Sequence, residues 1–423
     1  MRRSGALPED QPRPRRAAAQ AAGRLTLAEA GEERPAAHRV ARHTLLSAVS
    51  EGSTVLLFVL GFLAARLLGA TGFGYYQAAF AFVGLFRILP DFGMAYAATL
   101  AISRDRSRAE SLVGNLFGFQ LVLSLLTLAS CLALGAWRYE GVTLFAVVVL
   151  SFDLVLKAIK TTLRWVLRGL TRFGVEALSL LLERTLLLAL GGLSLWRGWG
   201  VAGFVLVFVG VRLADTLGLF AFVHRAVLPL RPAADLRLWW ELFRKGVPVA
   251  YAGAVITLIF QVDTVLLEAM RGAREVGFYR APVLVLEGIS IVPRVLSYAF
   301  IPTMAAWYAK SPEVVTALYR RGCKYLLLVA LPIGAFSLLE SDRFIALVFG
   351  AEYAPSAFAA RLLLPAAVFM FLSNFGETTL ACVNRWGTIV VIATVSLALN
   401  IGLNLVWIPR FGFWGAALAT LVT

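Results

Sequence analysis

Long apolar runs recur along the chain from residue 45 onward, and short stretches that carry Arg, Lys, Pro or Gly separate them. A helix that crosses the hydrocarbon of a bilayer needs about 20 apolar residues. Lipid favours helices because all their backbone groups are paired within the segment. The runs therefore predict membrane-spanning helices at 45–68, 76–102, 111–135, 141–166, 176–196, 200–224, 246–268, 278–308, 323–349, 356–381 and 386–408.

A twelfth apolar run begins at Gly412 and continues for about 11 residues to Thr423, roughly half the length that a span needs. A span cannot end within the hydrocarbon. We therefore expect the natural chain to continue beyond Thr423.

The composition agrees with a membrane protein and excludes a soluble enzyme. Of the 423 residues, 59% are apolar and 15% are charged, whereas a soluble domain has about 45–50% apolar and about 25% charged residues. The net charge of +15 does not indicate a nucleic-acid-binding protein, because the basic residues lie in short clusters between apolar runs, as in cytoplasmic loops. Cys131, Cys323 and Cys382 lack the spacing of a metal site or disulfide framework, and we expect them to pack within or beside the spans.

The first 42 residues differ from the rest, being rich in Arg, Ala, Pro and Glu and lacking the apolar core of a secretory signal. We predict that 1–42 is a disordered, basic cytoplasmic tail. With the tail inside, the cytoplasmic links hold about 18 Lys or Arg and the opposite links about 8, as the positive-inside rule requires. This places an N-lobe of six spans at 43–225, a cytoplasmic link at 226–245 and a C-lobe of spans 7–12 at 246–423.

Two stretches of the chain repeat one pattern. Residues 69–78 read GATGFGYYQA and residues 272–281 read GAREVGFYRA, and the same spacing of 203 residues aligns Pro90 with Pro293. The shared glycines are expected to let the chain turn at the external face. The prolines are expected to kink spans 2 and 8 and to shape a cavity between the halves.

A second pair of matches appears at a spacing of 212–213 residues. The sequence RFG at 172–174 matches RWG at 385–387, and Gly200 matches Gly412. Six predicted spans separate the copies, and an even number gives both halves the same orientation in the membrane. The architecture predicted is a parallel repeat of two six-helix lobes.

With these motifs in this order, residues 43–423 resemble the polysaccharide-biosynthesis, or oligosaccharide flippase, branch of the multidrug/oligosaccharidyl-lipid/polysaccharide (MOP) superfamily. The resemblance implies an all-α polytopic membrane protein with 12 to 14 spans in two lobes, a V-shaped alternating-access transporter. This chain departs from the family by stopping inside the twelfth span. The motifs that carry the resemblance are LGATGFGYY at 68–76, DFGM at 91–94 followed by Arg104, VGFY at 276–279, VFGAEY at 348–353 and GxxGA at 412–416.

Ionisable residues within spans are candidates for function, because placing a charge in lipid is costly. A lipid-linked oligosaccharide carries a diphosphate, whose oxygens fit the fork of a guanidinium group. We predict that Arg87, Arg294, Arg212 and Arg184 bind this diphosphate in a central cavity. Pairing between neighbours remains open, namely Glu183 with Arg184 and Arg212 with Asp215. Lys157 and Lys160 are expected to extend to the lipid headgroups.

Two further roles concern carboxylates. Asp91 and Arg294 occupy equivalent positions in the repeat with opposite charge, and we hypothesise that they form a gate that pairs in one state and separates in the other, unless each has a local partner. Asp263 and Glu287 are candidates for coupling to a proton or sodium ion, since a buried carboxylate can exchange one. A hydrogen-bonded polar spot is the alternative. Glu51 and Glu377 are other carboxylates within spans, and Asn400 and Asn404 lie one turn apart.

The sequence gives little support for catalysis. It has no Walker A loop and no HExxH helix, and its three histidines lie in the tail or at cytoplasmic edges. We predict no catalytic residues, no metal site and no cofactor. Glu340 and Asp342 form a lone external acidic pair.

The predicted function is translocation of a polyprenyl-diphosphate-linked oligosaccharide from the inner to the outer leaflet, for polysaccharide or lipopolysaccharide biosynthesis. The alternatives are a cation-coupled drug or metabolite antiporter of the same superfamily and a membrane glycosyltransferase or polymerase. The expected location is the inner (plasma) membrane, with the N-terminus in the cytoplasm. The expected partners are the lipid-linked substrate, membrane lipids, a polysaccharide polymerase and glycosyltransferases, but not nucleic acid.

Overall fold

The computed structural model describes residues 52–423 apart from 96, 99–108, 171, 228–230 and 309. The predicted tail at 1–42 lies outside the described residues. Within the described part, every regular element is helical, which confirms the all-α fold.

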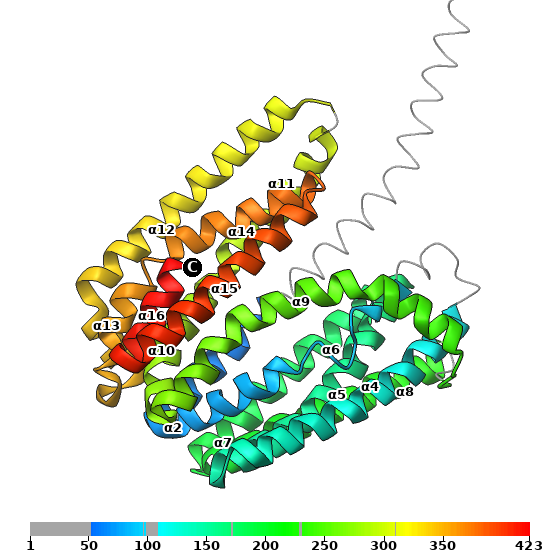
Figure 1. Cartoon of the computed structure of the whole chain (residues 1–423), viewed down its shortest axis with the longest axis horizontal. Coiled ribbons are helices and arrows are strands. Elements are labelled where there is room, and N and C mark those ends of the chain that lie inside the picture. The colour runs from blue at the N-terminus through cyan, green and yellow to red at the C-terminus, as the bar shows by residue number, and fades with distance from the viewer. Residues whose placement is uncertain (1–51, 96, 99–108, 171, 228–230, 309) are drawn as a thin grey trace, which may run out of the picture. The chain divides into compact units, whose positions relative to one another are not determined.

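The helices form two groups in chain order (Figure 1). The first group is α2 (Thr54–Leu85), α4 (Ala109–Arg138), α5 (Gly141–Gly169), α6 (Phe173–Leu186), a π-helical turn η2 (Leu187–Gly191), α7 (Gly192–Trp196) and α8 (Gly200–Ala226). The second is α9 (Leu236–Arg271), α10 (Ala273–Ile289), α11 (Ile291–Tyr308), α12 (Pro312–Phe349), a 3-10 turn η3 (Ala351–Tyr353), α13 (Ser356–Leu363), α14 (Ala367–Cys382), α15 (Trp386–Phe411) and α16 (Phe413–Val422).

Nine described helices are long and apolar enough to cross a membrane, or ten if α13 and α14, bent by 44°, count as one span. The number differs from the predicted twelve partly because α2 counts as one helix although it consists of two. A kink at Gly69, with φ +69° and ψ 174°, separates them between the spans predicted at 45–68 and 76–102. The tenth-span prediction, 356–381, corresponds to the bent pair.

The two prolines lie close to breaks between helices. Pro90 lies in a series of turns after α2 has stopped at Leu85, and Pro293 lies in the first turn of α11, where a missing N–H is tolerated. Ala273–Ser297 still counts as one candidate span, so the break at Ser290 lies within the predicted span 278–308, close to the kink predicted at Pro293. Both repeats break the helix at nearly the same register, since α10 stops at Ile289.

The predicted link at 226–245 is mostly helical. Helix α8 ends at Ala226, and α9 already begins at Leu236, where the carboxylate of Asp235 accepts hydrogen bonds from the amides of Arg237 (2.9 Å) and Leu238 (3.3 Å). Such an N-cap satisfies amides that the first turn of a helix leaves without partners.

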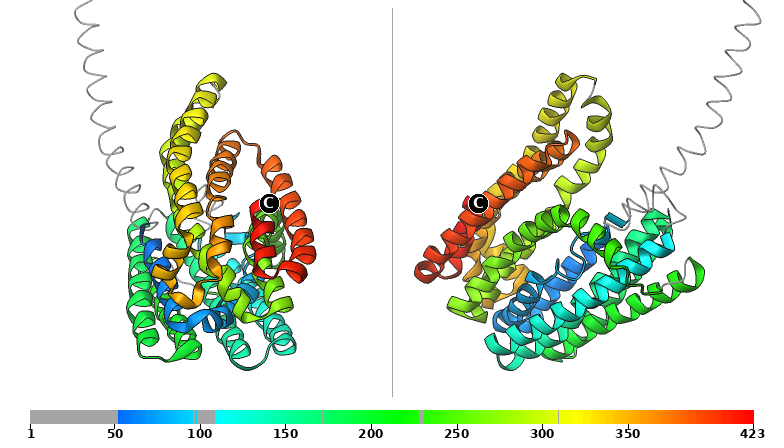
Figure 2. Two further views of the ribbon diagram at one scale, coloured as in Figure 1. Left: turned by 90° about the vertical axis from the view of Figure 1, so that its left-hand side faces the viewer. Right: turned by 45° about the vertical axis from the view of Figure 1, so that its right-hand side comes forward.

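Within each group, helices that are far apart in the sequence pack together. In the first group α5 packs along α8, α4 and α2; in the second, α15 packs on α9 and α16, and α12 on α14 (Figure 2). The most extensive contact of all joins α2 to α10, with α2 also packed on α9. One apolar core runs through residues of both groups, among them Phe73, Phe204, Phe349 and Phe371.

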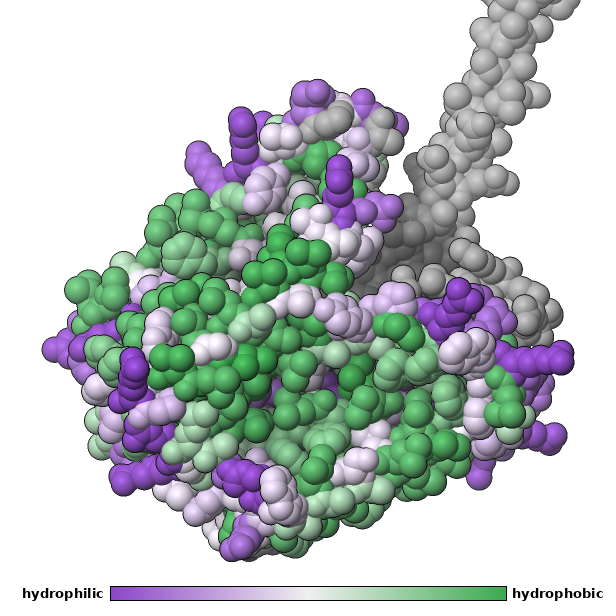
Figure 3. Space-filling view, in the orientation of Figure 1, coloured by the Kyte–Doolittle hydropathy of each residue, from purple (hydrophilic) through white to green (hydrophobic). Residues whose placement is uncertain are grey.

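Apolar side chains also cover much of the outer surface (Figure 3). Leu328 and Leu339 on α12 are 73% and 78% exposed, and Leu125 and Leu126 on α4 are similarly open. Large exposed apolar areas are unusual in soluble proteins. They are expected of helices that face lipid.

The predicted repeat has a structural counterpart at the α2–α10 contact. A Cβ added to Gly74 would overlap the carbonyl of Ala273, and a Cβ added to Gly277 would overlap the carbonyl of Ala70. In the repeat alignment Gly74 corresponds to Gly277 and Ala70 to Ala273, so each copy offers the other the same glycine and the same carbonyl.

The second set of matches is also equivalent in structure. Arg172 precedes α6 with φ −94° and ψ 49°, and Arg385 precedes α15 with φ −95° and ψ 45°. Gly200 and Gly412 both have positive φ, +64° and +60°, at the starts of α8 and α16. These conformations confirm the prediction that shared glycines let the chain turn.

Candidate functional site

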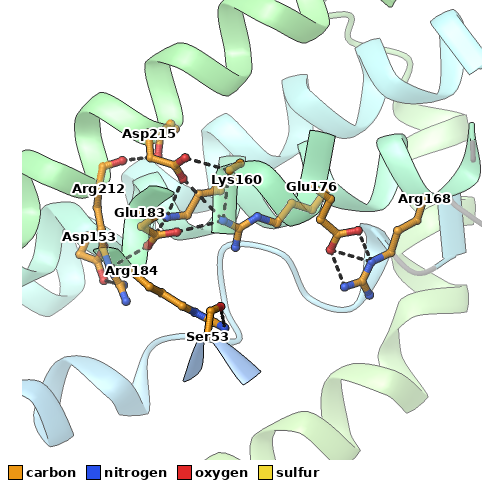
Figure 4. Close-up of polar contacts among 12 residues, drawn as sticks. Ser53, Asp153, Lys160, Arg168, Glu176, Glu183, Arg184, Arg212 and Asp215 are labelled. Atoms are coloured by element: carbon orange, nitrogen blue, oxygen red, sulfur yellow. Dashed lines mark hydrogen bonds and ion pairs between the residues drawn. The ribbon is translucent and has the colours of Figure 1, made fainter. Parts of the chain in front are cut away.

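Eight charged side chains lie in or beside the interior of the first helix group, and we call them the charged cluster. Their carboxylates come from α5, α6 and α8 (Figure 4). Their cations come from α5, α8 and the turns after α2. The members are Arg87, Asp153, Lys157, Lys160, Arg164, Glu183, Arg212 and Asp215.

Glu183 on α6 is the centre of the cluster. Its carboxylate lies 2.7 Å from Nζ of Lys160, 2.9 Å from Nη2 of Arg164 and 3.5 Å from Nε of Arg212. The side chains of Glu183 and Lys160 are only 6% and 4% exposed. A buried charge of this kind persists because several opposite charges surround it.

The other two carboxylates extend the network to both sides of Glu183. Asp215 on α8 lies 3.3 Å from Lys160 and 3.5 Å from Arg164, and it accepts a 2.8 Å hydrogen bond from Oγ of Ser179. Asp153 on α5 accepts a 2.5 Å hydrogen bond from Nη1 of Arg212. The network therefore ties α5, α6 and α8 together.

These contacts correct three expectations. Glu183 pairs with cations of α5 and α8 instead of Arg184, and Arg212 pairs with Asp153 instead of Asp215. Lys160 does not extend to the headgroups, because it is buried between Glu183 and Asp215. Contacts between helices that pack face to face therefore form here instead of contacts between sequence neighbours.

The four arginines predicted to bind a diphosphate have different surroundings. Arg212 is part of the cluster and Arg87 lies beside it, with Arg212 and Asp153 as its charged neighbours. Arg184 instead donates a 2.6 Å hydrogen bond to Oγ of Ser53. Arg294 is exposed and donates to the carbonyl (3.3 Å) and hydroxyl (3.2 Å) of Ser290. The structure thus brings two of the four together.

Two cations of the cluster stand out among the residues that the structure describes. The side chains of Arg87 and Lys157 have no hydrogen bond or ion pair there, although the other three cations each have at least one carboxylate partner. Arg87 is exposed, and Lys157 is half-buried. The cluster as a whole holds five cations and three carboxylates, an excess of two positive charges.

The proposed gate pair is not in contact in this structure. Asp91 accepts a 3.1 Å hydrogen bond from the amide of Ala95, and Arg294 has its partners on Ser290. Each residue therefore has the local partner that was the alternative, at least in this conformation.

A second polar centre lies among α9, α10, α15 and α16. The buried carboxylate of Asp263 accepts hydrogen bonds from Tyr279 (2.9 Å), Thr420 (2.8 Å) and Asn404 (2.7 Å), and Asn404 also donates to Asn400 (3.0 Å). All four neighbours are neutral. Glu287, the other carboxylate predicted to couple an ion, is elsewhere and pairs with Arg280 at 3.1 Å.

Several residues of these two centres were not singled out from the sequence. Asp153 and Arg164 share a spacing with Lys157 and Lys160 that places all four on one face of α5, and this spacing was a usable signal. Tyr279 and Thr420 gave no such signal, because a single Tyr or Thr within an apolar helix is common. Only the fold shows that both lie next to Asp263.

Comparison with known proteins fits this architecture. The family model for polysaccharide biosynthesis proteins matches residues 40–307. No curated protein is similar enough in sequence to count as a relative.

The fold is shared with solved transporters at low sequence identity. An inward-facing multidrug resistance MATE family transporter of the MOP superfamily has TM-score 0.71 at 15% identity, covering 88% of this chain and 90% of its own. The lipid II flippase MurJ in an inward closed conformation has TM-score 0.73 at 11% identity, covering 90% and 84%. An outward-facing MATE family transporter has TM-score 0.57 at 14% identity, covering 91% of each chain.

Three observations lead to one assignment. They are a family match over more than half of the chain, a helical fold shared with MOP superfamily proteins, and an internal repeat of the kind expected for that fold. The chain belongs to the polysaccharide biosynthesis protein family.

Proposed function

We propose that the protein is a flippase that moves a polyprenyl-diphosphate-linked oligosaccharide from the inner to the outer leaflet for polysaccharide or cell-envelope biosynthesis. The observation that carries this proposal is the excess of two positive charges in the charged cluster, among helices that are apolar enough to span a membrane. The family match and the fold shared with a lipid II flippase support it.

The physical argument concerns the cost of uncompensated charge. Ionisable groups within a membrane are expensive unless they are paired or hydrated, and the three carboxylates compensate only three of the five cations. An anionic headgroup that enters the cluster supplies the missing charge. Phosphate oxygens are suitable because they accept charge-assisted hydrogen bonds from both guanidinium and ammonium groups.

The main alternative is a cation-coupled drug or metabolite antiporter. The fold shared with multidrug transporters favours it. The sign of the charged cluster argues against it, because a site with excess positive charge repels a cationic drug. A glycosyltransferase or polymerase has less support still, since Glu340 and Asp342 lie near the exposed end of α12, each paired with an arginine.

The coupling ion is proposed to bind at Asp263. Its carboxylate is surrounded by the hydroxyl and amide groups of Tyr279, Thr420, Asn404 and Asn400, and oxygen ligands of this kind suit a hard cation such as sodium. A proton is the other candidate. Glu287 has less support for this role, because Arg280 already neutralises it.

The gate between Asp91 and Arg294 remains a proposal for another state of the transport cycle. A charge swap tests it: Asp91→Arg and Arg294→Asp should each reduce translocation, and the double variant should recover part of the activity. A double variant no better than either single variant would contradict the gate.

We also propose the orientation that the basic links indicate, with the N-terminus and the link at 226–245 in the cytoplasm of a cell whose inner membrane holds the protein. A polymerase and glycosyltransferases that make and consume the lipid-linked oligosaccharide are the proposed functional partners.

The function is tested with purified protein in liposomes. A fluorescent polyprenyl-diphosphate oligosaccharide is placed in both leaflets, and a membrane-impermeant quencher reports the fraction that exchanges. We expect exchange to depend on the protein, and deletion of the gene to accumulate lipid-linked precursor on the cytoplasmic face. Transport of a cationic dye without exchange of the lipid would contradict the proposal and favour the antiporter.

A further inference from the structure

We infer that the start of α9 is a binding surface for the headgroups of anionic phospholipids, made by Leu236, Arg237, Trp240 and Arg244. All four side chains are exposed on the first turns of the helix, and we call them the α9 surface. This surface concerns the lipids that surround the protein, so it is independent of the lipid that the protein is proposed to move.

The α9 surface combines an apolar stripe with a basic stripe. Leu236 and Trp240 are four residues apart and Arg237 and Arg244 are seven apart, so each pair lies on one side of the helix and the two sides are adjacent. Leu236 is 73% exposed and Trp240 is 64% exposed. Tryptophan rings beside arginines are typical of the interface between membrane and water, where an apolar body and a charged group both find a suitable environment.

The charge that this surface presents is positive. Lys245 lies in the same turns, but it pairs with Glu241 at 2.6 Å, so these two charges compensate each other. Within the part of the chain that the structure describes, the guanidinium groups of Arg237 and Arg244 form no ion pair with a carboxylate. Two exposed arginines beside an apolar stripe are complementary to a lipid surface that carries net negative charge.

The opposite side of the same turns is fixed to the first helix group. The amide of Asp235 donates a 2.7 Å hydrogen bond to Oδ1 of Asn115 on α4. The ring of Trp239 stacks on Phe119, with 4.9 Å between the ring centroids, and Leu242 is buried. The backbone that carries the exposed stripes is therefore already ordered, which reduces the entropy lost when a ligand binds.

The length of α9 places these turns at the level of the headgroups. Its 36 residues extend about 54 Å, whereas the hydrocarbon of a bilayer is about 30 Å thick. The apolar part of the helix begins at Gly246, and four charged residues lie in the stretch 236–245 that precedes it. The excess length is therefore at the start of α9, where the exposed stripes are.

The two stripes have different roles. Trp240 and Leu236 insert among the upper parts of the acyl chains, and this contact is the same for a zwitterionic and an anionic lipid. The arginines distinguish the two lipids, because each basic residue close to an anionic surface strengthens binding roughly fivefold. Removal of the charges should therefore abolish the preference without removing the contact.

The test measures which lipids contact Trp240. The protein is reconstituted in phosphatidylcholine bilayers that contain increasing fractions of brominated phosphatidylglycerol or brominated phosphatidylcholine, with the bromine near the headgroup, where it quenches adjacent tryptophans. The chain has 10 tryptophans, so the contribution of Trp240 is the difference between the wild type and Trp240→Phe. We expect both lipids to quench this contribution, and phosphatidylglycerol to have an association constant roughly fivefold higher or more.

The same measurement on arginine variants identifies the source of the preference. Arg237→Gln combined with Arg244→Gln should bring the ratio of the two association constants close to one. It should leave quenching by phosphatidylcholine and the melting temperature near those of the wild type, because both arginines are exposed. The corresponding double substitution to lysine keeps the charge and should retain the preference. Arg343→Gln is the matched control, since it removes an exposed arginine of α12 and should change neither lipid.

Two results would overturn the inference. If brominated lipids quench the wild type and Trp240→Phe to the same extent, Trp240 faces water and the α9 surface does not bind lipid. If phosphatidylglycerol has no advantage in the wild type, or keeps its advantage in the glutamine variant, the two arginines do not recognise an anionic headgroup. Neither result affects the proposed function, because translocation is not measured.

Discussion

At the scale of single residues, the arrangement around Glu183 shows how a membrane helix bundle tolerates many charges. One carboxylate contacts Lys160, Arg164 and Arg212 from two other helices, and all of these groups are largely shielded from solvent. Loss of one member leaves its partners buried without compensation, which is far more costly than the loss of an exposed pair.

Glu183→Gln should therefore lower the free energy of unfolding by about 3–5 kcal/mol. Thermal unfolding in detergent measures this. Glu340→Gln is the control, because Glu340 pairs with Arg343, whose side chain is 86% exposed, and such pairs contribute about 0–1 kcal/mol. Similar melting temperatures for the two variants would show that the cluster does not hold the helices together.

Asp263 differs from Glu183 because its hydrogen-bond donors are all neutral. If sodium binds there, adding sodium should stabilise the wild type, by about 2.7 kcal/mol when its concentration is 100 times Kd. Asp263→Asn should abolish this increase in melting temperature.

The control for Asp263 is Glu377→Gln, which removes an exposed carboxylate on α14 and should retain the response to sodium. A sodium response that survives Asp263→Asn would place the ion elsewhere. If the wild type does not respond to sodium, the proton remains the candidate for coupling.

At this scale, many of the charged residues of the site could be predicted from the sequence, but the residues with which they pair could not. Arg87, Arg212, Glu183 and Asp263 are visible in the sequence because a charge inside an apolar run is costly and needs a reason. Their partners are not visible. Arg212 meets Asp153, 59 residues away, and nothing short of the packing of α5 on α8 indicates this contact.

At the scale of elements, glycine determines how closely α2 and α10 approach. Gly74 and Gly277 each pack on a backbone carbonyl of the other helix, with no space for a side chain. The repeat in the sequence predicted equivalent glycines, and it correctly assigned turns to Gly200 and Gly412. It did not predict that Gly74 and Gly277 would lie at a helix crossing, because a glycine that permits a turn and a glycine that permits close packing look the same in one sequence.

Gly277→Ala should disrupt this crossing, because its Cβ would overlap the carbonyl of Ala70. We expect a clear fall in melting temperature and in the yield of monodisperse protein. Gly210→Ala on α8 is the control, since nothing lies near the added Cβ and alanine is favoured over glycine in a helix by about 1 kcal/mol. The two substitutions should thus have opposite signs. Equal effects would mean that helix propensity, and not the close packing of α2 on α10, determines the change in stability.

At the scale of the whole molecule, the middle of α2, around the kink at Gly69, is hydrogen-bonded to the second helix group. Arg66 donates a hydrogen bond to the carbonyl of Leu347 (2.9 Å). The hydroxyl of Tyr353 donates to the carbonyl of Ala65 (2.8 Å), and the amide of Ala70 donates to the carboxylate of Glu352 (3.0 Å). Burial raises the pKa of the Tyr353 phenol, so it remains a neutral donor. These three hydrogen bonds close the contact between α2 and the second helix group.

Tyr353→Phe should loosen this closure, because it removes one hydrogen bond worth about 1 kcal/mol, or roughly a fivefold change in the population of the open state. Distances between spin labels at Trp137 and Leu347, both highly exposed, measure that population. Tyr308→Phe is the control, as Tyr308 is an exposed residue of α11. If the distance distribution is the same in Tyr353→Phe as in the wild type, the hydrogen bond of Tyr353 does not control opening.

The reciprocal packing of Gly74 on Ala273 and of Gly277 on Ala70 has a consequence for the origin of the chain. Two surfaces that meet through the same atoms on both sides are self-complementary, which is the defining property of a two-fold dimer. A protein of half this length, inserted twice in one orientation, could have assembled through this contact before duplication and fusion joined the copies. The two copies now differ in their polar interiors, because the first contains the charged cluster and the second the neutral surroundings of Asp263.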